Sequence, residues 1–126
     1  MSQVNTKWEI NGKIYELDLE DADTAERYES AFEMMEQEEK QLPKDGKTSE
    51  IIRAYCKLFE NLYDRLFGDG CGKEIIGEKA NTRTCNEVYD DFLRFVSFQK
   101  QESLAFQNSL VSKYSPNRAQ RRAAAK

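Results

Sequence analysis

The sequence predicts an α+β fold that is mostly α-helical, with an N-terminal β-hairpin, three main helices and a flexible basic C-terminal tail. Three observations predict it. Apolar and polar residues alternate around an early Asn-Gly pair, three longer stretches repeat apolar residues at helical spacing, and the last residues are basic without large apolar side chains. Since 126 residues is the length of one domain, we expect residues 1–114 to form it and residues 115–126 to form the tail.

The stretch WEINGKIYELDL predicts the hairpin. Apolar residues alternate with polar ones on both sides of Asn11-Gly12, the dipeptide that best tolerates the positive φ angles of a type I′ turn. We expect the hairpin over residues 6–19, with strands over 6–10 and 13–19. Because an isolated two-stranded hairpin is marginal in water, its apolar face should pack against helices.

Three stretches have helical periodicity, over residues of about 23–40, 49–67 and 84–113. The second has the broadest apolar stripe, which is typical of the central helix of a core. The third is the longest, and its second half is mostly polar, so we expect that half to project from the body or to dock on a neighbour. The residues expected to cap these helices are Asp23, Thr48 or Ser49, and Thr84.

Charge is distributed unevenly along the chain. The net charge is −4, but residues 113–126 contain five basic residues and no acid, so residues 1–112 carry −9. Between Glu16 and Glu39, eleven acidic residues accompany only Arg27. This acidic body opposes attraction of the tail to nucleic acid, and we expect no nucleic-acid partner. The tail then either binds an acidic protein surface or is a solvated terminus without a role.

No signature of catalysis, metal binding or membrane insertion is present, and we expect neither enzymatic activity nor a cofactor. The chain lacks histidine, the commonest general base. Its three cysteines have no CxxC spacing, and Cys56 and Cys85 fit apolar helical patterns as small buried residues. The glycine-rich stretch FGDGCGKEIIG lacks the spacing of a phosphate-binding loop, so we expect it to connect helices. No apolar run approaches the roughly 20 residues of a membrane span.

Four stretches together resemble the tail assembly chaperones of siphophages and prophages of Gram-positive bacteria. They are the opening WEINGKIYELDL with the acidic helix start, the segment RAYCKLFENLYDRLFGDGCGKEIIGEKANTRTCNEVYDDFLRFV, its polar continuation, and the closing NRAQRR. The resemblance implies a non-enzymatic role in the host cytoplasm. Such chaperones coat the helical tape measure protein and help to recruit subunits of the major tail protein.

Coating a helical partner requires an exposed apolar surface and a net charge that keeps the complex in solution. The polar half of the last helix is expected to supply this surface, or a surface for homo-oligomerisation. The residues expected to face a partner are Leu104, Phe106, Leu110, Val111, Arg118, Arg121 and Arg122. An alternative is an acidic regulatory protein or host-defence inhibitor that mimics DNA, for which the candidate residues are Glu29, Glu33 and Glu36.

Overall fold

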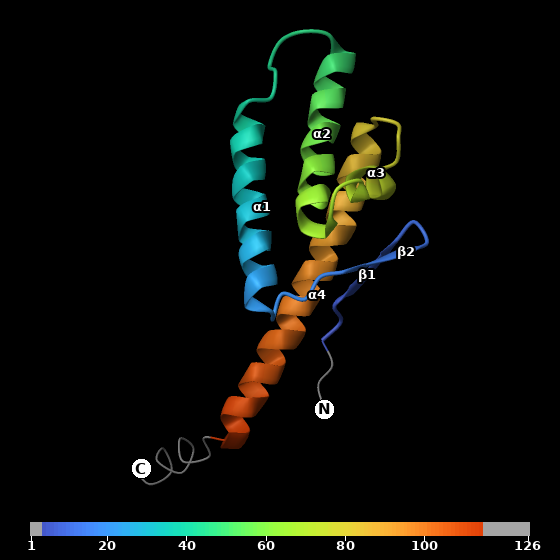
Figure 1. Cartoon of the computed structure of the whole chain (residues 1–126). Coiled ribbons are helices and arrows are strands. Elements are labelled where there is room, and N and C mark those ends of the chain that lie inside the picture. Colours follow the sequence, from blue (N-terminus) through green and yellow to red (C-terminus); the bar gives the residue numbers. More distant parts are fainter. Residues whose placement is uncertain (1–3, 115–126) are drawn as a thin grey trace.

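A computed structural model describes residues 4–114 of the chain (Figure 1). Its elements are, in order, β1 (Lys7–Ile10), β2 (Lys13–Glu16), α1 (Ala22–Lys40), α2 (Thr48–Phe67), α3 (Cys71–Ile76) and α4 (Thr82–Tyr114). This mostly helical architecture with an N-terminal hairpin confirms the predicted fold class. Helices α1 and α2 lie antiparallel, and α4 continues well past them (Figure 1). The predicted flexible tail, residues 115–126, lies outside the described residues.

The hairpin turns where the sequence predicts it, at Asn11 and Gly12. Both residues have positive φ, 54° and 75°, as a type I′ turn requires. The ladder pairs Trp8 with Tyr15, and both side chains are buried. The predicted second strand, residues 13–19, was too long, because regular pairing ends at Glu16. Beyond that point the N–H of Leu17 still donates to the carbonyl oxygen of Thr6 across the hairpin, at 2.7 Å, whereas the carbonyl oxygen of Leu17 and the N–H of Leu19 bond to a helix.

That helix contact is made by Gln99 of α4, whose side chain is only 1 % exposed. Its Nε2 donates to the carbonyl oxygens of Leu17, at 2.8 Å, and Asn5, at 3.1 Å. Its Oε1 accepts the backbone N–H of Leu19 at 2.6 Å. One amide therefore pairs with three backbone groups, and its bond to the Leu17 carbonyl oxygen is buried while the other two bonds are partly buried.

Helices α1 and α4 begin slightly earlier than predicted, because other residues cap them. Asp21 caps α1 in place of Asp23, and its carboxylate accepts the backbone N–H of Thr24 at 3.0 Å. The side chain of Asn81 accepts the backbone N–H of Thr84 at 3.2 Å, so Thr84 lies inside α4. Asp and Asn are among the strongest N-terminal caps, since their short side chains reach the free N–H groups of the first turn.

Helix α2 begins at Thr48, with Lys47 at its N-cap position and no side-chain hydrogen bond there. The prediction that Thr48 or Ser49 caps this helix was therefore wrong. The predicted central position of α2 is confirmed, because it contacts α1, α3 and α4. Its buried residues are Cys56, Leu58, Phe59, Leu62, Tyr63 and Leu66.

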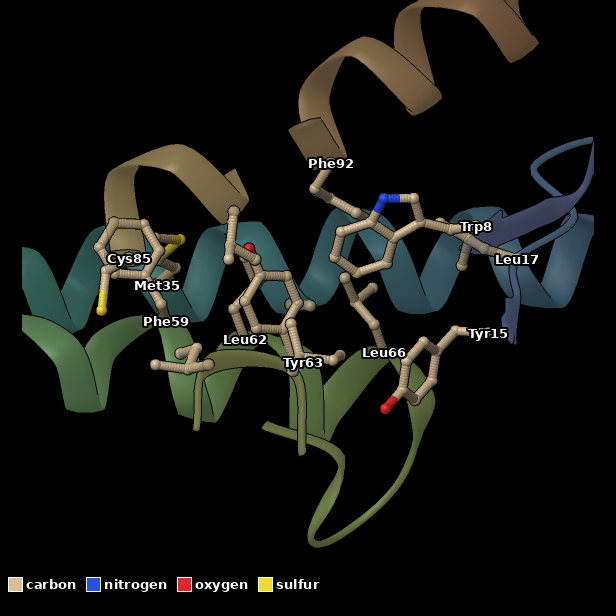
Figure 2. Packing of buried hydrophobic residues seen from close by; sticks show 14 of the residues in the cluster. Trp8, Tyr15, Leu17, Met35, Phe59, Leu62, Tyr63, Leu66, Cys85 and Phe92 are labelled. Carbon is tan, nitrogen blue, oxygen red and sulfur yellow. The ribbon is translucent and has the colours of Figure 1, made fainter. Parts of the chain in front are cut away.

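The hairpin closes the core through Trp8, which is 2 % exposed (Figure 2). The indole lies near the rings of Tyr63 and Phe92, at centroid distances of 5.7 and 5.1 Å. Its Nε1 donates to Asp91 of α4 at 2.8 Å. The expectation that the apolar face of the hairpin packs against helices is confirmed.

The glycine-rich stretch connects α2 to α3, as predicted. The carboxylate of Asp64 accepts the backbone N–H groups of Gly70, at 3.1 Å, and Gly72, at 2.7 Å. These are N–H groups of the kind that bind phosphate in other loops, and here the protein's own carboxylate occupies them. A Cβ atom on Gly72 would lie 2.2 Å from the carbonyl oxygen of Glu60, so only glycine fits there.

Candidate partner-binding surfaces

The second half of α4 leaves the core after Gln99, as the sequence predicts. From position 100 to position 111 the residues are exposed or half-buried, and none is buried. Leu104 is 58 % exposed and Val111 is 50 % exposed. In Figure 1 this part of the helix extends away from α2 and the hairpin. Two large apolar side chains therefore contact solvent on a projecting helix.

The four predicted apolar residues of this segment lie on two faces of α4. Since an α-helix turns by about 100° per residue, Leu104 and Val111 share one side. Phe106 and Leu110 lie on the opposite side, in line with the buried Gln99. Phe106 is half-buried, and Leu110 is 36 % exposed. The first pair therefore forms the outward face, and the second pair continues the core-facing stripe beyond the body.

A hollow of about 400 Å³ lies beside the outward face, between α1 and α4. The ammonium group of Lys100 sits 5.3 Å from the ring centroid of Tyr28 across it, a cation–π geometry. On the other side of Lys100, the hydroxyl of Ser103 donates a hydrogen bond to the carboxylate of Glu20 at 2.9 Å. The residues that line the hollow are Tyr28, Leu93, Val96, Ser97, Lys100, Gln101 and Leu104.

Sequence reasoning missed Leu93 and misjudged Phe98. Both lie in the first half of the last predicted helix, whereas the sequence assigned the exposed surface to its second half. Leu93 is 38 % exposed and shares the outward face with Leu104 and Val111. Phe98 is 62 % exposed. The spacing of 11 and then 7 residues between the three outward residues, close to whole helical turns, is the signal that identifies this face.

The charged residues predicted to face a partner, basic in the tail and acidic in the first helix, differ in whether the structure describes them. Arg118, Arg121 and Arg122 lie outside the described residues. Glu29, Glu33 and Glu36 are exposed along one side of α1, and none forms an ion pair within residues 4–111. Neighbouring Glu38 instead points to α2, where it binds both terminal nitrogens of Arg65, at 2.7 and 2.8 Å.

The cysteines pack as the sequence predicts. Cys56 and Cys85 are buried, at 5 and 0 % exposure. Burial, and then the nearby Cys56, raise the pKa of Cys85 to about 12, so its thiol stays protonated at neutral pH. No cluster of metal-binding side chains occurs among the described residues. Within residues 4–114, no helix has both the length and the apolar character needed to span a membrane.

Comparisons with known proteins give one match. Searches of the curated proteins and of the solved structures each found none. The model of a family of unknown function, DUF6673, matches residues 11–125, which include all four helices and most of the basic C-terminal segment. With nearly the whole chain covered, the protein belongs to the DUF6673 family.

Proposed function

We propose that this protein is a non-enzymatic tail assembly chaperone of a phage or prophage. It acts in the host cytoplasm, binds helical segments of the tape measure protein and helps to recruit the major tail protein. The observation that carries the proposal is the outward face of α4, formed by Leu93, Leu104 and Val111, which leaves three large apolar side chains in solvent. Exposed apolar residues at helical spacing are the usual contact of a protein that binds amphipathic helices.

Replacement of Leu104 and Val111 by glutamate tests this face. Both side chains are at least half exposed, so the double variant should fold, and its thermal unfolding should match that of the wild type. Co-expressed tape measure protein should no longer co-purify with it. The matched control is glutamate at Ala105 and Ser109, which are exposed on the same helix but lie about 100° or more around it from Leu104. Undiminished co-purification with the Leu104 and Val111 variant would contradict the proposed contact.

The basic residues need a separate variant, because they lie outside the described part of the chain. Truncation after Tyr114 removes Arg118, Arg121 and Arg122 while retaining all of α4. We expect a folded domain with weaker binding to the tape measure protein. Equal binding by the truncated and full-length chains would remove the tail from the proposed surface.

A second candidate function is DNA mimicry. The specific observation in its favour is the exposed row Glu29, Glu33 and Glu36, which forms no ion pair within residues 4–111. A mimic should bind a basic groove with an affinity that falls steeply with salt. The chaperone should instead bind with a negative heat-capacity change that reports apolar burial. Calorimetry at two salt concentrations distinguishes the two functions.

A further inference from the structure

The glutamate row of α1 borders an apolar groove between α1, α2 and the first half of α4. The groove has a volume of about 620 Å³. Its apolar lining, called the floor here, consists of Tyr28, Phe32, Met35, Leu42, Tyr55, Leu58, Phe59 and Tyr89. Its acidic lining, called the rim, consists of Glu29, Glu33, Glu36 and Glu39. The groove shares only Tyr28 with the hollow beside the outward face of α4.

The floor is aromatic and only partly covered by the protein. Tyr28 packs against Phe32 at 4.7 Å between ring centroids, and Phe59 packs against Tyr89 at 5.0 Å. Phe59 is buried, whereas the other three rings are half-buried. An aromatic surface of this kind contributes strongly to an interface when a partner covers it, because it buries a large apolar area with few rotatable bonds.

The rim carries negative charge that the described residues do not neutralise. All four rim glutamates are exposed, and none forms an ion pair within residues 4–111. Burial raises the pKa of Tyr89, and the Glu39 carboxylate raises it further, which places this negative charge beside the floor. Cations placed along the rim would therefore be attracted over the length of the groove.

The dimensions fit one helix. The lining runs along α1 from Tyr28 to Leu42 just beyond its end. At about 1.5 Å per residue, this distance is about 20 Å, or between three and four helical turns. We propose that the groove binds an amphipathic helix of a partner protein, one with large apolar side chains on one face and a row of Lys or Arg along one edge.

Other occupants fit less well. The rim repels nucleic acid. The outward face of α4 in a second copy contributes Leu93, Leu104 and Val111 but only Lys100 as a cation among the residues lining its hollow. The sequence SPNRAQRRAAAK has the cations but offers only alanine as apolar contact for the aromatic floor. A separate helix that combines both features matches floor and rim together, and this inference does not depend on the proposed function.

Selection from a display library of random 16-residue peptides tests the proposal on the full chain. Enriched peptides should place large apolar residues at i, i+3, i+4 and i+7, with Lys or Arg along one edge of that face. Binding of an enriched peptide should weaken about tenfold or more in the rim variant, with glutamine at Glu29, Glu33, Glu36 and Glu39, since several exposed charge pairs are lost. The control variant has glutamine at Glu9, Glu50, Glu78 and Glu87, which are exposed and outside the groove. Its affinity should stay within about twofold of the wild type, because all four rim glutamates are intact. Its net charge equals that of the rim variant, so long-range attraction of a basic peptide is reduced equally in both variants.

Nuclear magnetic resonance locates the bound peptide. Resonances of Tyr28, Tyr55 and Tyr89 should shift, while those of Val111 should not. The proposal is overturned by enriched peptides without basic residues, by no enrichment, by equal weakening in the rim and control variants, or by shifts confined to the second half of α4. Two further results would overturn the proposal by assigning the groove to another occupant. A dimer that dissociates in the rim variant would assign it to a second copy of the chain. Shifts of the tyrosine resonances on truncation after Tyr114, without peptide, would assign it to the chain's own C-terminal segment.

Discussion

Gln99 in the middle of α4 donates its side-chain N–H to the carbonyl oxygen of Leu17 across 2.8 Å. This bond joins residues 82 positions apart and is part of the contact that ends the hairpin. It also marks the level at which α4 leaves the core, because no residue from 100 to 111 is buried. A single amide thus connects the folded body to the projecting surface.

Replacement of Gln99 by leucine should lower the free energy of unfolding by about 2–4 kcal/mol. Leucine has a similar volume but leaves the buried carbonyl oxygen of Leu17 and the partly buried N–H of Leu19 without their partner. Urea denaturation measures the change. Leucine at the exposed Gln101 is the control and should change stability by less than about 0.5 kcal/mol. Similar values for the two variants would show that the Gln99 bonds contribute little.

Replacement of Gly72 by alanine should cost more than the same change at Gly70. At Gly72 the new Cβ meets the Glu60 carbonyl oxygen at 2.2 Å, so α3 must shift, at a cost of about 1–3 kcal/mol or more. Gly70 has open space around it and a φ of 92°, and its cost is the backbone strain of about 1–2 kcal/mol. Thermal melts of both variants give the ranking, and the reverse order would contradict the close approach of α3 to α2.

Replacement of Tyr63 by phenylalanine should leave stability unchanged or raise it by about 1 kcal/mol. The hydroxyl of Tyr63 is the one buried side-chain polar atom among the described residues that lacks a hydrogen-bond partner. Phenylalanine keeps the ring contacts with Trp8 and Phe92 and removes the cost of the unpaired group. Denaturant unfolding compares the two proteins. A loss of more than about 1 kcal/mol would indicate that the hydroxyl has a partner after all.

Replacement of Glu38 by glutamine should lower stability by about 1 kcal/mol at pH 7 and by less near pH 3. The Arg65 hydrogen bonds hold the pKa of Glu38 below its usual value. A carboxyl whose pKa falls on folding stabilises the protein above its unfolded pKa, and this contribution is lost as the pH falls through the folded pKa. Melts from pH 3 to 7 test this, with glutamine at Glu36, which forms no ion pair within residues 4–111, as the control. A difference between Glu38 and glutamine that stays constant with pH would argue against the ion pair.

The sequence predicted the elements well, because their signals are local. Asn11 and Gly12 determine the turn, and the apolar stripe of α2 determines the central helix. The end of β2 was not predictable in this way, because it depends on Gln99, which is distant in sequence and resembles any polar residue of a helix. The N-caps of α1 and α4 were misjudged because two suitable residues lie within a few positions of each other at each helix start. These are Asp21 and Asp23 at α1, and Asn81 and Thr84 at α4.

The candidate surfaces were only partly predictable. The weak apolar content of the last helix indicated the exposed residues, and helical spacing divides them into two faces. Which of these faces points outward follows from the orientation that the buried Phe92 and Gln99 impose on α4. The groove escaped prediction because Tyr28, Phe32, Tyr55 and Tyr89 have core spacing. Their half-burial becomes evident only when α1, α2 and α4 are placed beside one another. Helical spacing of apolar residues is the same whether their face of the helix is buried in the core or exposed in a groove.

The contacts of Trp8 and Gln99 also determine when the protein can fold during its synthesis. Trp8 bonds to Asp91, and Asn5 and Leu19 bond to Gln99, so the residues of the hairpin wait for partners that are translated much later. Until α4 has been synthesised, the indole and its neighbouring apolar residues remain exposed to solvent. The hairpin by itself is too small to be stable. Folding of the described domain is therefore completed only after α4 has been synthesised.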